Sequence, residues 1–280
     1  MQKTFFNTPA PNPNLVLNPD GVSIKGCSII YAPKGQAGEY SRLATNPYRG
    51  CGHGCAYCFC PSVLRMDRAE FNAGAIPRKN FLNNLIKDAR KYQTIKSQEQ
   101  VMLSFTTDPY HPGDTALTRD TLVALKEHGL SFCTLTKGGS RALRDLDLFR
   151  PERDAFASTL TSLDPDFSKK WEPNAALPED RISTLLKFHR AGIFTWVSLE
   201  PVLDTEATLA IIERTHPYVD FFKIGRVNYS NLTKTTDWEK FTHDILDVVI
   251  RLGVKAYFKK DLQPYLPKDH VNVQNFQQSN

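Results

Sequence analysis

The sequence has 280 residues, 41% of them hydrophobic and 23% charged, and 35 Lys and Arg against 30 Asp and Glu give a net charge of +5. This length can bury a full-sized core in one large domain or two small ones, and the composition excludes wholesale disorder, collagen and a coiled coil. No stretch approaches the roughly 18–20 unbroken apolar residues of a membrane helix, and no signal-peptide-like apolar run opens the chain, so we expect a soluble, cytoplasmic protein without a membrane segment.

The first part of the chain is expected to be irregular. Residues 1–20 contain four prolines and four asparagines, which predicts an arm without regular structure. Residues 27–32, CSIIYA, are predicted to form a strand in which Cys27 packs as a small hydrophobic residue. We therefore divide the chain into an N-terminal arm and leading strand at 1–44, a core domain at 45–260 and a C-terminal tail at 261–280.

Four of the six cysteines lie within ten residues, between positions 51 and 60. In a reducing compartment such crowding indicates metal ligation rather than disulfides. Cys51, Cys55 and Cys58 form the pattern C-x3-C-x2-C, and glycines at positions 50, 52 and 54 leave the backbone free to wrap around a bulky object. Three thiolates on a four-iron cluster leave one iron without a protein ligand, and a substrate or cofactor can bind at such an open position.

The alternative for the same segment is a zinc site in which Cys60 or His53 supplies a fourth ligand. Zinc motifs usually contain two well-separated cysteine pairs, and this sequence has no second pair. The spacing therefore favours iron–sulfur and leaves zinc as the alternative.

A basic segment follows the cysteines. Residues 61–97 hold eight Lys and Arg against three Asp and Glu. This excess could form a patch that faces the phosphates of a nucleic acid, or it could be the solvated face of a helix.

From residue 101 onward, short apolar runs alternate with amphipathic stretches. Strands are predicted at 101–105, 131–136, 155–160, 193–200, 218–224 and 255–259. Three stripes with helical spacing hold Leu82, Leu85, Ile86 and Ala89; Ile182, Leu185, Leu186 and His189; and Trp238, Phe241, Ile245, Val248 and Leu252. This alternation predicts an α/β fold, a partial (β/α)6-type TIM barrel of parallel strands with the cysteine loop near its N-terminal part. A doubly wound sheet is the alternative, although no GxGxxG follows any strand.

In a barrel of this kind the reactive groups lie at the carboxyl ends of the strands. This rule selects residues 106–108, 136–137, 158–161, 198–200 and 225–226.

The cysteine motif, with an aromatic residue before its last cysteine, resembles the radical S-adenosylmethionine (SAM) superfamily. The segments NPYRGCGHGCAYCF, TTDPYHPG, TLTKGGSRALRDLDLF and TSLDPDFSKKWEPNAALPEDRISTLLKFHRAG are similar to its spore-photoproduct-lyase-like branch, over roughly residues 45–260. The resemblance implies that Cys51, Cys55 and Cys58 bind a 4Fe-4S cluster whose free iron is chelated by SAM. One electron then cleaves the SAM sulfonium into methionine and a 5′-deoxyadenosyl radical, which abstracts a substrate hydrogen, while the protein positions the reactants and excludes water and oxygen.

The same resemblance assigns cofactor contacts. Tyr57 is similar to the aromatic residue that lies beside the adenine. Thr106, Thr107 and Asp108 stand where the superfamily binds the methionyl amino group, and a carboxylate is a good acceptor for an ammonium. The alternative for Asp108 is a turn-forming role before a proline. Lys137 could meet the SAM carboxylate or could be an ordinary solvated lysine.

Three further residues at strand ends are candidate cofactor contacts. Ser158 could bond a polar group of the cofactor. Ser198 and Glu200 end the strand where the superfamily often holds the ribose hydroxyls, and a carboxylate suits a vicinal diol. Glu200 could instead be a structural partner of an arginine such as Arg226.

Outside these contacts, Glu172 and Arg181 match the E-P…R pattern of the branch and are expected around the site. Cys133 lies within a predicted strand and could donate a hydrogen atom to a substrate radical, although packing is the alternative. Spore photoproduct lyase carries its hydrogen-donating cysteine on the strand after the cluster segment. This sequence has no cysteine between Cys60 and Cys133, which argues against thymine-dimer repair with the same donor.

We therefore predict a radical SAM enzyme that acts on an organic substrate, with a nucleic-acid base as the leading candidate. Its partners would be a one-electron donor such as flavodoxin or ferredoxin and, for that substrate, nucleic acid; a monomer is the default. One alternative is a non-catalytic zinc-binding module that recognises nucleic acid. Another is a family member whose cluster serves only redox sensing.

Overall fold

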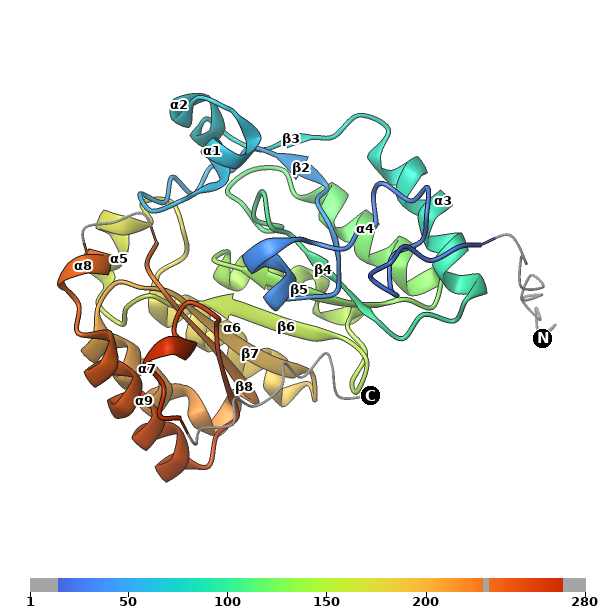
Figure 1. Ribbon diagram of the computed structural model, residues 1–280. Coiled ribbons are helices and arrows are strands. Elements are labelled where there is room, and N and C mark those ends of the chain that lie inside the picture. Colours follow the sequence, from blue (N-terminus) through green and yellow to red (C-terminus); the bar gives the residue numbers. More distant parts are fainter. Residues whose placement is uncertain (1–14, 229–231, 269–280) are drawn as a thin grey trace.

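The computed structural model describes residues 15–228 and 232–268, and its centre is a sheet of seven parallel strands curled into a half-barrel (Figure 1). The strands follow one another around the sheet in chain order: β1 (Leu43–Thr45), β4 (Gln100–Leu103), β5 (Ser131–Thr136), β6 (Ala155–Thr159), β7 (Phe194–Val202), β8 (Phe221–Arg226) and β9 (Ala256–Phe258). A separate antiparallel pair, β2 (Tyr48–Arg49) and β3 (Ile76–Pro77), accompanies the cysteine segment. The predicted partial TIM barrel is confirmed, because the strand order never reverses as it would in a doubly wound sheet.

All six predicted strands are present, with ends that differ by at most three residues from those expected. The strand β1 was not predicted as an element of its own, and the expected boundary after residue 44 falls inside it. The strand predicted at 27–32 is wrong. One oxygen of Asp88 accepts hydrogen bonds from the successive backbone N–H groups of Ser28, Ile29 and Ile30, which curls this segment and leaves only an isolated bridge at Tyr31.

Five helices of eleven residues or more lie among the described residues: α3 (Phe81–Thr94), α4 (Ala116–Glu127), α6 (Pro178–Arg190), α7 (Thr205–Thr215) and α9 (Trp238–Leu252). The shorter elements are α1 (Cys60–Leu64), α2 (Arg68–Asn72), α5 (Pro165–Trp171), α8 (Leu232–Thr235), and the 3-10 helices η1 (Gly35–Glu39), η2 (Gly139–Leu148), η3 (His216–Tyr218) and η4 (Gln263–Tyr265). The three predicted stripes are confirmed in α3, α6 and α9, whereas α4 and α7 were not predicted. In the described part of the chain, no helix has the length and apolar character needed to cross a membrane.

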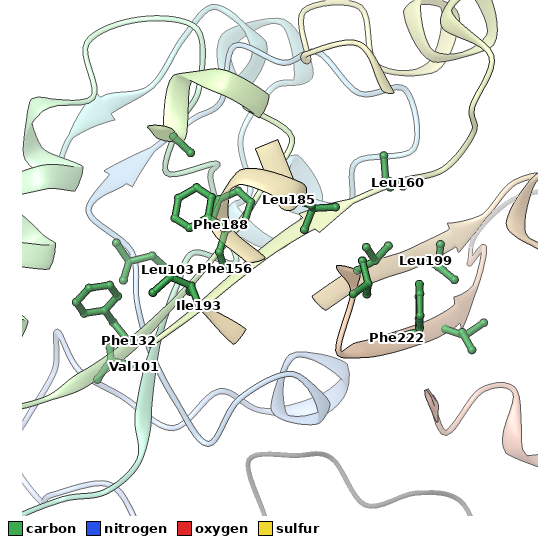
Figure 2. Close-up of a cluster of buried hydrophobic side chains, with 14 of the residues drawn as sticks. Val101, Leu103, Phe132, Phe156, Leu160, Leu185, Phe188, Ile193, Leu199 and Phe222 are labelled. Carbon is green, nitrogen blue, oxygen red and sulfur yellow. The ribbon is translucent and has the colours of Figure 1, made fainter. Parts of the chain in front are cut away.

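The outer face of the sheet carries the larger hydrophobic core, part of which is drawn in Figure 2. Alternate residues of each strand point to this face, such as Val101 and Leu103 of β4 and Phe156 of β6. The rings of Phe156 and Phe188, the latter on α6, stack with centroids 3.8 Å apart. Burial of these side chains holds the helices against the outside of the half-barrel.

The inner face of the sheet carries a smaller core made by the intervening residues. Its members are Tyr40, Ala44, Met102, Cys133, Ala155, Ala157, Trp196 and Phe221. Half of them are small, and the large side chains of Tyr40, Met102, Trp196 and Phe221 fill the remaining space. The interior is therefore packed at mid-strand, and ligand-accessible groups are confined to the carboxyl ends of the strands.

The segment that precedes β1 joins the two edges of the curled sheet. Tyr31 pairs with Ala44 on β1, one edge strand. Further along, the Glu39 carboxylate accepts hydrogen bonds from the Tyr257 hydroxyl at 3.0 Å and from the Lys260 backbone N–H at 2.8 Å, beside β9, the other edge strand. This brings Tyr40 into the interior of the half-barrel.

Candidate functional site

The cysteine loop leaves the carboxyl end of β1 through the β2–β3 pair. Gly50 adopts φ +85°, and a Cβ at this position would lie 2.3 Å from the Gly74 carbonyl oxygen. Only glycine satisfies both conditions. The Cys51 backbone N–H then donates to the Phe71 carbonyl at 2.8 Å, which ties the first cysteine to the end of α2.

The loop is held mainly through its backbone. The Ala56 N–H donates to Trp171 O at 2.9 Å, and Asn174 bonds the loop twice, from its N–H to His53 O at 3.1 Å and from its side chain to Gly52 O at 3.0 Å. The guanidinium of Arg68 donates to Cys58 O at 2.8 Å. These contacts fix the path of the loop without using the sulfur atoms of its cysteines.

Cys55 is buried, and Cys51 and Cys58 are half-buried. Burial, the main cause, raises the pKa of the Cys51 and Cys55 thiols to about 12, whereas the neighbouring Cys60 lowers the pKa of Cys58 to about 6. A bound cation reverses the effect of burial and deprotonates its thiol ligands. Three sulfurs on one glycine-rich loop fit the donor set of an iron–sulfur cluster.

The two residues considered as a fourth zinc ligand have hydrogen-bond partners within the protein. The buried His53 imidazole accepts a hydrogen bond from Arg141 at 2.8 Å and places Nδ1 3.4 Å from Asp108 Oδ2, and burial lowers its pKa to about 4. The Cys60 thiol donates to the Phe105 carbonyl at 3.2 Å. Within residues 15–228 and 232–268, no three His, Cys, Asp or Glu side chains converge as they would around a single ion. A structural zinc ion needs four converging donors.

Tyr57 is anchored to a buried ion pair. Its hydroxyl donates to Glu172, whose other oxygen lies 2.6 Å from the Arg181 guanidinium, and both charged side chains are at most 1% exposed. Burial alone would raise the pKa of Glu172, but Arg181 and Lys137 outweigh it and lower that pKa. Arg181 also donates to Thr159 O at 3.0 Å, at the end of β6. The pair predicted around the site therefore connects the cysteine loop to the sheet.

Lys137 lies beside Tyr57. Its ammonium is 5.5 Å from the centroid of the Tyr57 ring, and the side chain is half-buried. Burial would lower the pKa of Lys137, but Cys55, Glu172 and Asp108 together raise it. Lys137 is therefore a cation at the site rather than a freely solvated lysine, and its contact with the SAM carboxylate stays a prediction.

Asp108 joins the ends of β4 and β5. One carboxylate oxygen accepts from the Thr136 hydroxyl at 2.6 Å and the Tyr110 N–H at 2.8 Å, and the other accepts from the Lys137 N–H at 2.8 Å. These contacts support the turn-forming role. The amino-group contact of Asp108 stays a prediction, for which its already satisfied oxygens leave little capacity.

Its two neighbours are bonded to other parts of the site. The Thr107 hydroxyl donates to Gly50 O at 2.6 Å, and the Thr106 N–H donates to the Asn46 side chain at 3.1 Å. Both threonines are half-buried. Their cofactor contacts likewise stay predictions.

Strand alternation separates Ser158 from the other candidates. Ser158 shares the outer face of β6 with Phe156, and its hydroxyl donates to Thr136 O at 3.0 Å. This orientation weighs against its predicted cofactor contact. Ser198 and Glu200 share the inner face of β7 with Trp196, and of the two Ser198 is 1% exposed whereas the Glu200 side chain is 17% exposed.

Glu200 does not pair with Arg226, so that alternative was wrong. The Lys259 ammonium, at the end of β9, lies 2.6 Å from both oxygens of the Glu200 carboxylate. The Tyr40 hydroxyl bonds both Glu200 and Ser198. Tyr40 carried no sequence signal, but Lys259 ends the predicted strand 255–259 and the strand-end rule could have found it.

Cys133 is fully buried in the inner core, and burial raises the pKa of its thiol to about 12. Its sulfur accepts a hydrogen bond from the Trp196 indole at 3.3 Å. These contacts support packing, and hydrogen donation stays a prediction. Among the described residues, the buried hydroxyls without a hydrogen-bond partner include Ser104 and Thr161, just past the ends of β4 and β6, where a polar cofactor would satisfy them.

Known proteins that resemble this chain distinguish the iron–sulfur interpretation of this site from the zinc interpretation. Residues 45–215 match the family model of the radical SAM superfamily. The chain belongs to this superfamily. Membership implies use of SAM and of an iron–sulfur cluster.

Sequence relatives of this radical SAM chain include two uncharacterized proteins, Rv2578c of Mycobacterium tuberculosis and Mb2609c of Mycobacterium bovis. Each is 30% identical over 172 residues, which cover 58% of this chain and 50% of the relative. The chain thus spans about half the length of the curated relatives it matches.

Solved radical SAM structures share the fold. A spore photoproduct lyase variant matches with a TM-score of 0.64 and 14% identity, over 84% of this chain and 80% of that chain. Spore photoproduct lyase in complex with a dinucleoside spore photoproduct gives 0.62 and 16%, over 85% and 81%. SuiB of Streptococcus suis gives 0.57 and 13%, over 84% and 54%. These matches show that the chain shares the fold of those proteins.

Proposed function

We propose that this radical SAM enzyme holds a 4Fe-4S cluster through Cys51, Cys55 and Cys58 and uses it to abstract hydrogen from an organic substrate. When bound, the reduced cluster supplies the electron that cleaves SAM into methionine and a 5′-deoxyadenosyl radical. The observation that carries this proposal is the cysteine loop itself, which lies at the carboxyl edge of the half-barrel and is held by backbone bonds that leave its three cysteine sulfurs for iron.

The surrounding residues would bind and orient SAM. Lys137 places a cation beside Tyr57, suited to the carboxylate of the methionyl group while the ring packs against the adenine. Glu200, on the inner face of β7, would accept from the ribose. Burial of the loop by the Glu172 segment would exclude water and oxygen from the radical.

For the substrate we propose a nucleic-acid base. The similar lyase structure carries a dinucleoside, and the segment that follows the cysteine loop exposes the basic side chains Arg65, Arg68, Arg78 and Lys79. Phosphate contacts made by such side chains would give binding a strong salt dependence. A one-electron donor of the flavodoxin or ferredoxin class would reduce the cluster.

The test is anaerobic. The protein is reconstituted with iron and sulfide, given dithionite and SAM, and assayed for 5′-deoxyadenosine. We expect the product from wild type, its loss in Cys55→Ala, and its retention in the matched control Cys27→Ala, since Cys27 lies outside the loop. A protein that retains zinc but no iron, and loses the zinc in Cys60→Ser, would contradict the proposal and support a zinc module.

The substrate is tested separately, by titrating single-stranded DNA and RNA onto the cluster-loaded protein at two salt concentrations. We expect affinity to fall steeply with salt and to be reduced in Arg65→Ala/Lys79→Ala. Salt-independent binding or none would refute a nucleic-acid substrate while leaving SAM cleavage intact.

A further inference from the structure

We propose that Tyr40 and Lys259 are positioning residues that hold Glu200 so that it accepts one ribose hydroxyl of SAM, through Oε1, rather than both hydroxyls of the diol. This inference rests on the proposed function. It differs from the expectation that the carboxylate spans the vicinal diol.

The contacts of Glu200 fix its orientation. Lys259 Nζ lies 2.6 Å from Oε1 and 2.6 Å from Oε2, and the Tyr40 hydroxyl donates to Oε2. The Lys259 side chain is 2% exposed and that of Glu200 17% exposed. The lysine is therefore enclosed, while the Glu200 side chain remains partly exposed.

The lone pairs of the Glu200 carboxylate determine how many further hydrogen bonds it can accept. An ionised carboxylate has about four acceptor sites, two on each oxygen. Lys259 and Tyr40 occupy both sites of Glu200 Oε2, and Lys259 occupies one site of Oε1. One acceptor site remains, and it is on Oε1.

The proton of the Ser198 hydroxyl is also accounted for. The Tyr40 oxygen lies 2.8 Å from Ser198 Oγ, and either atom could donate in that bond. Because the Tyr40 proton is used on Glu200, the Ser198 hydroxyl must be the donor to Tyr40. Ser198 therefore has no proton to give to a ligand. The partly exposed Glu200 is the acceptor that remains at the end of β7.

Gly225 on β8 provides the space for the ion pair. A Cβ at this position would lie 2.8 Å from Lys259 Cδ and 2.9 Å from Glu200 Cδ. The Lys259 ammonium also lies 4.8 Å from the centroid of the Tyr40 ring, which stabilises it as a cation. Substitution of Gly225 would thus displace the pair without removing either charge.

The test measures the equilibrium affinity of the cluster-loaded protein for SAM and for its analogues that lack the 2′- or the 3′-hydroxyl. In wild type, deletion of one hydroxyl should weaken binding about tenfold or more, because a charge-assisted hydrogen bond is lost. Deletion of the other should change affinity by less than about threefold, an allowance for indirect effects. Lys259→Met and Gly225→Ala should bind SAM about as weakly as wild type binds the weaker of the two deoxy analogues. In these variants the difference in affinity between the two analogues should disappear.

Controls separate positioning from a general loss of structure. Lys255→Met, which removes an exposed lysine before β9, should keep the wild-type discrimination. Tyr40→Phe keeps the ring and should reduce discrimination without unfolding the protein. Equal penalties for the two hydroxyls in wild type, or full discrimination in Lys259→Met, would overturn the proposal. Absence of SAM binding to iron-loaded wild type would instead overturn the proposed function.

Discussion

Replacing Arg181 with leucine should destabilise the protein severely. The guanidinium is 1% exposed, pairs with the fully buried Glu172 at 2.6 Å, and donates to Thr159 O at 3.0 Å and Ala176 O at 2.6 Å. Its loss leaves a buried carboxylate without its counter-ion and two buried carbonyls without their donor. Breaking a buried pair in this way costs about 3–5 kcal/mol. The melting temperature should fall by roughly 6–20 °C for a domain of this size.

The assay is urea and thermal unfolding of wild type and variants, prepared with the same cluster content. A matched control is Arg214→Leu, which breaks an ion pair with Glu179 whose side chains are 45% and 70% exposed. This control should lower the free energy of unfolding by less than about 1 kcal/mol, because water solvates the Glu179 carboxylate that remains.

The double variant Arg181→Leu/Glu172→Leu tests the cause. Removal of both charges eliminates the unpaired carboxylate, so the double variant should be more stable than Arg181→Leu alone. A loss below about 1 kcal/mol in Arg181→Leu, or a double variant less stable than the single one, would refute the reasoning.

Two further results are expected. Gly50→Ala should lose iron and lower the free energy of unfolding by about 3 kcal/mol or more, because a Cβ at φ +85° would lie 2.3 Å from Gly74 O. The control Gly253→Ala has a similar φ of +65° but no atom within 4 Å, so it should lower the free energy of unfolding by only about 1 kcal/mol. Equal losses in the two variants would contradict the steric explanation. The lowered pKa of Glu172 means that its ionised form stabilises the fold above the ordinary value of 4.5, and that this stability is lost as pH falls through the folded pKa. Wild type should therefore lose stability in acid faster than the double leucine variant, and parallel pH profiles would refute the assignment.

The local pattern of residues was sufficient to predict the parallel half-barrel and the position of the cysteine loop. Apolar runs of strand length and stripes of helical spacing are properties of neighbouring residues, so they survive folding unchanged. The ligand motif is likewise local, since Cys51, Cys55 and Cys58 lie within eight residues. Where a side-chain contact outside the segment decided the backbone, as with Asp88 and residues 28–30, the strand prediction was wrong.

The side-chain pairs around the site depend on the tertiary structure. Tyr40 and Glu200 are separated by 160 residues, and Tyr57 and Glu172 by 115. No local pattern predicts such pairs, because they depend on how far the sheet curls and on which strands become its edges. The register of β6 turned Ser158 away from the interior, and the missing side chain of Gly225 admitted Lys259 to Glu200. The sequence thus predicted the cluster ligands, whereas the packing of β7, β8 and β9 decided which charged side chains face one another at the ends of those strands.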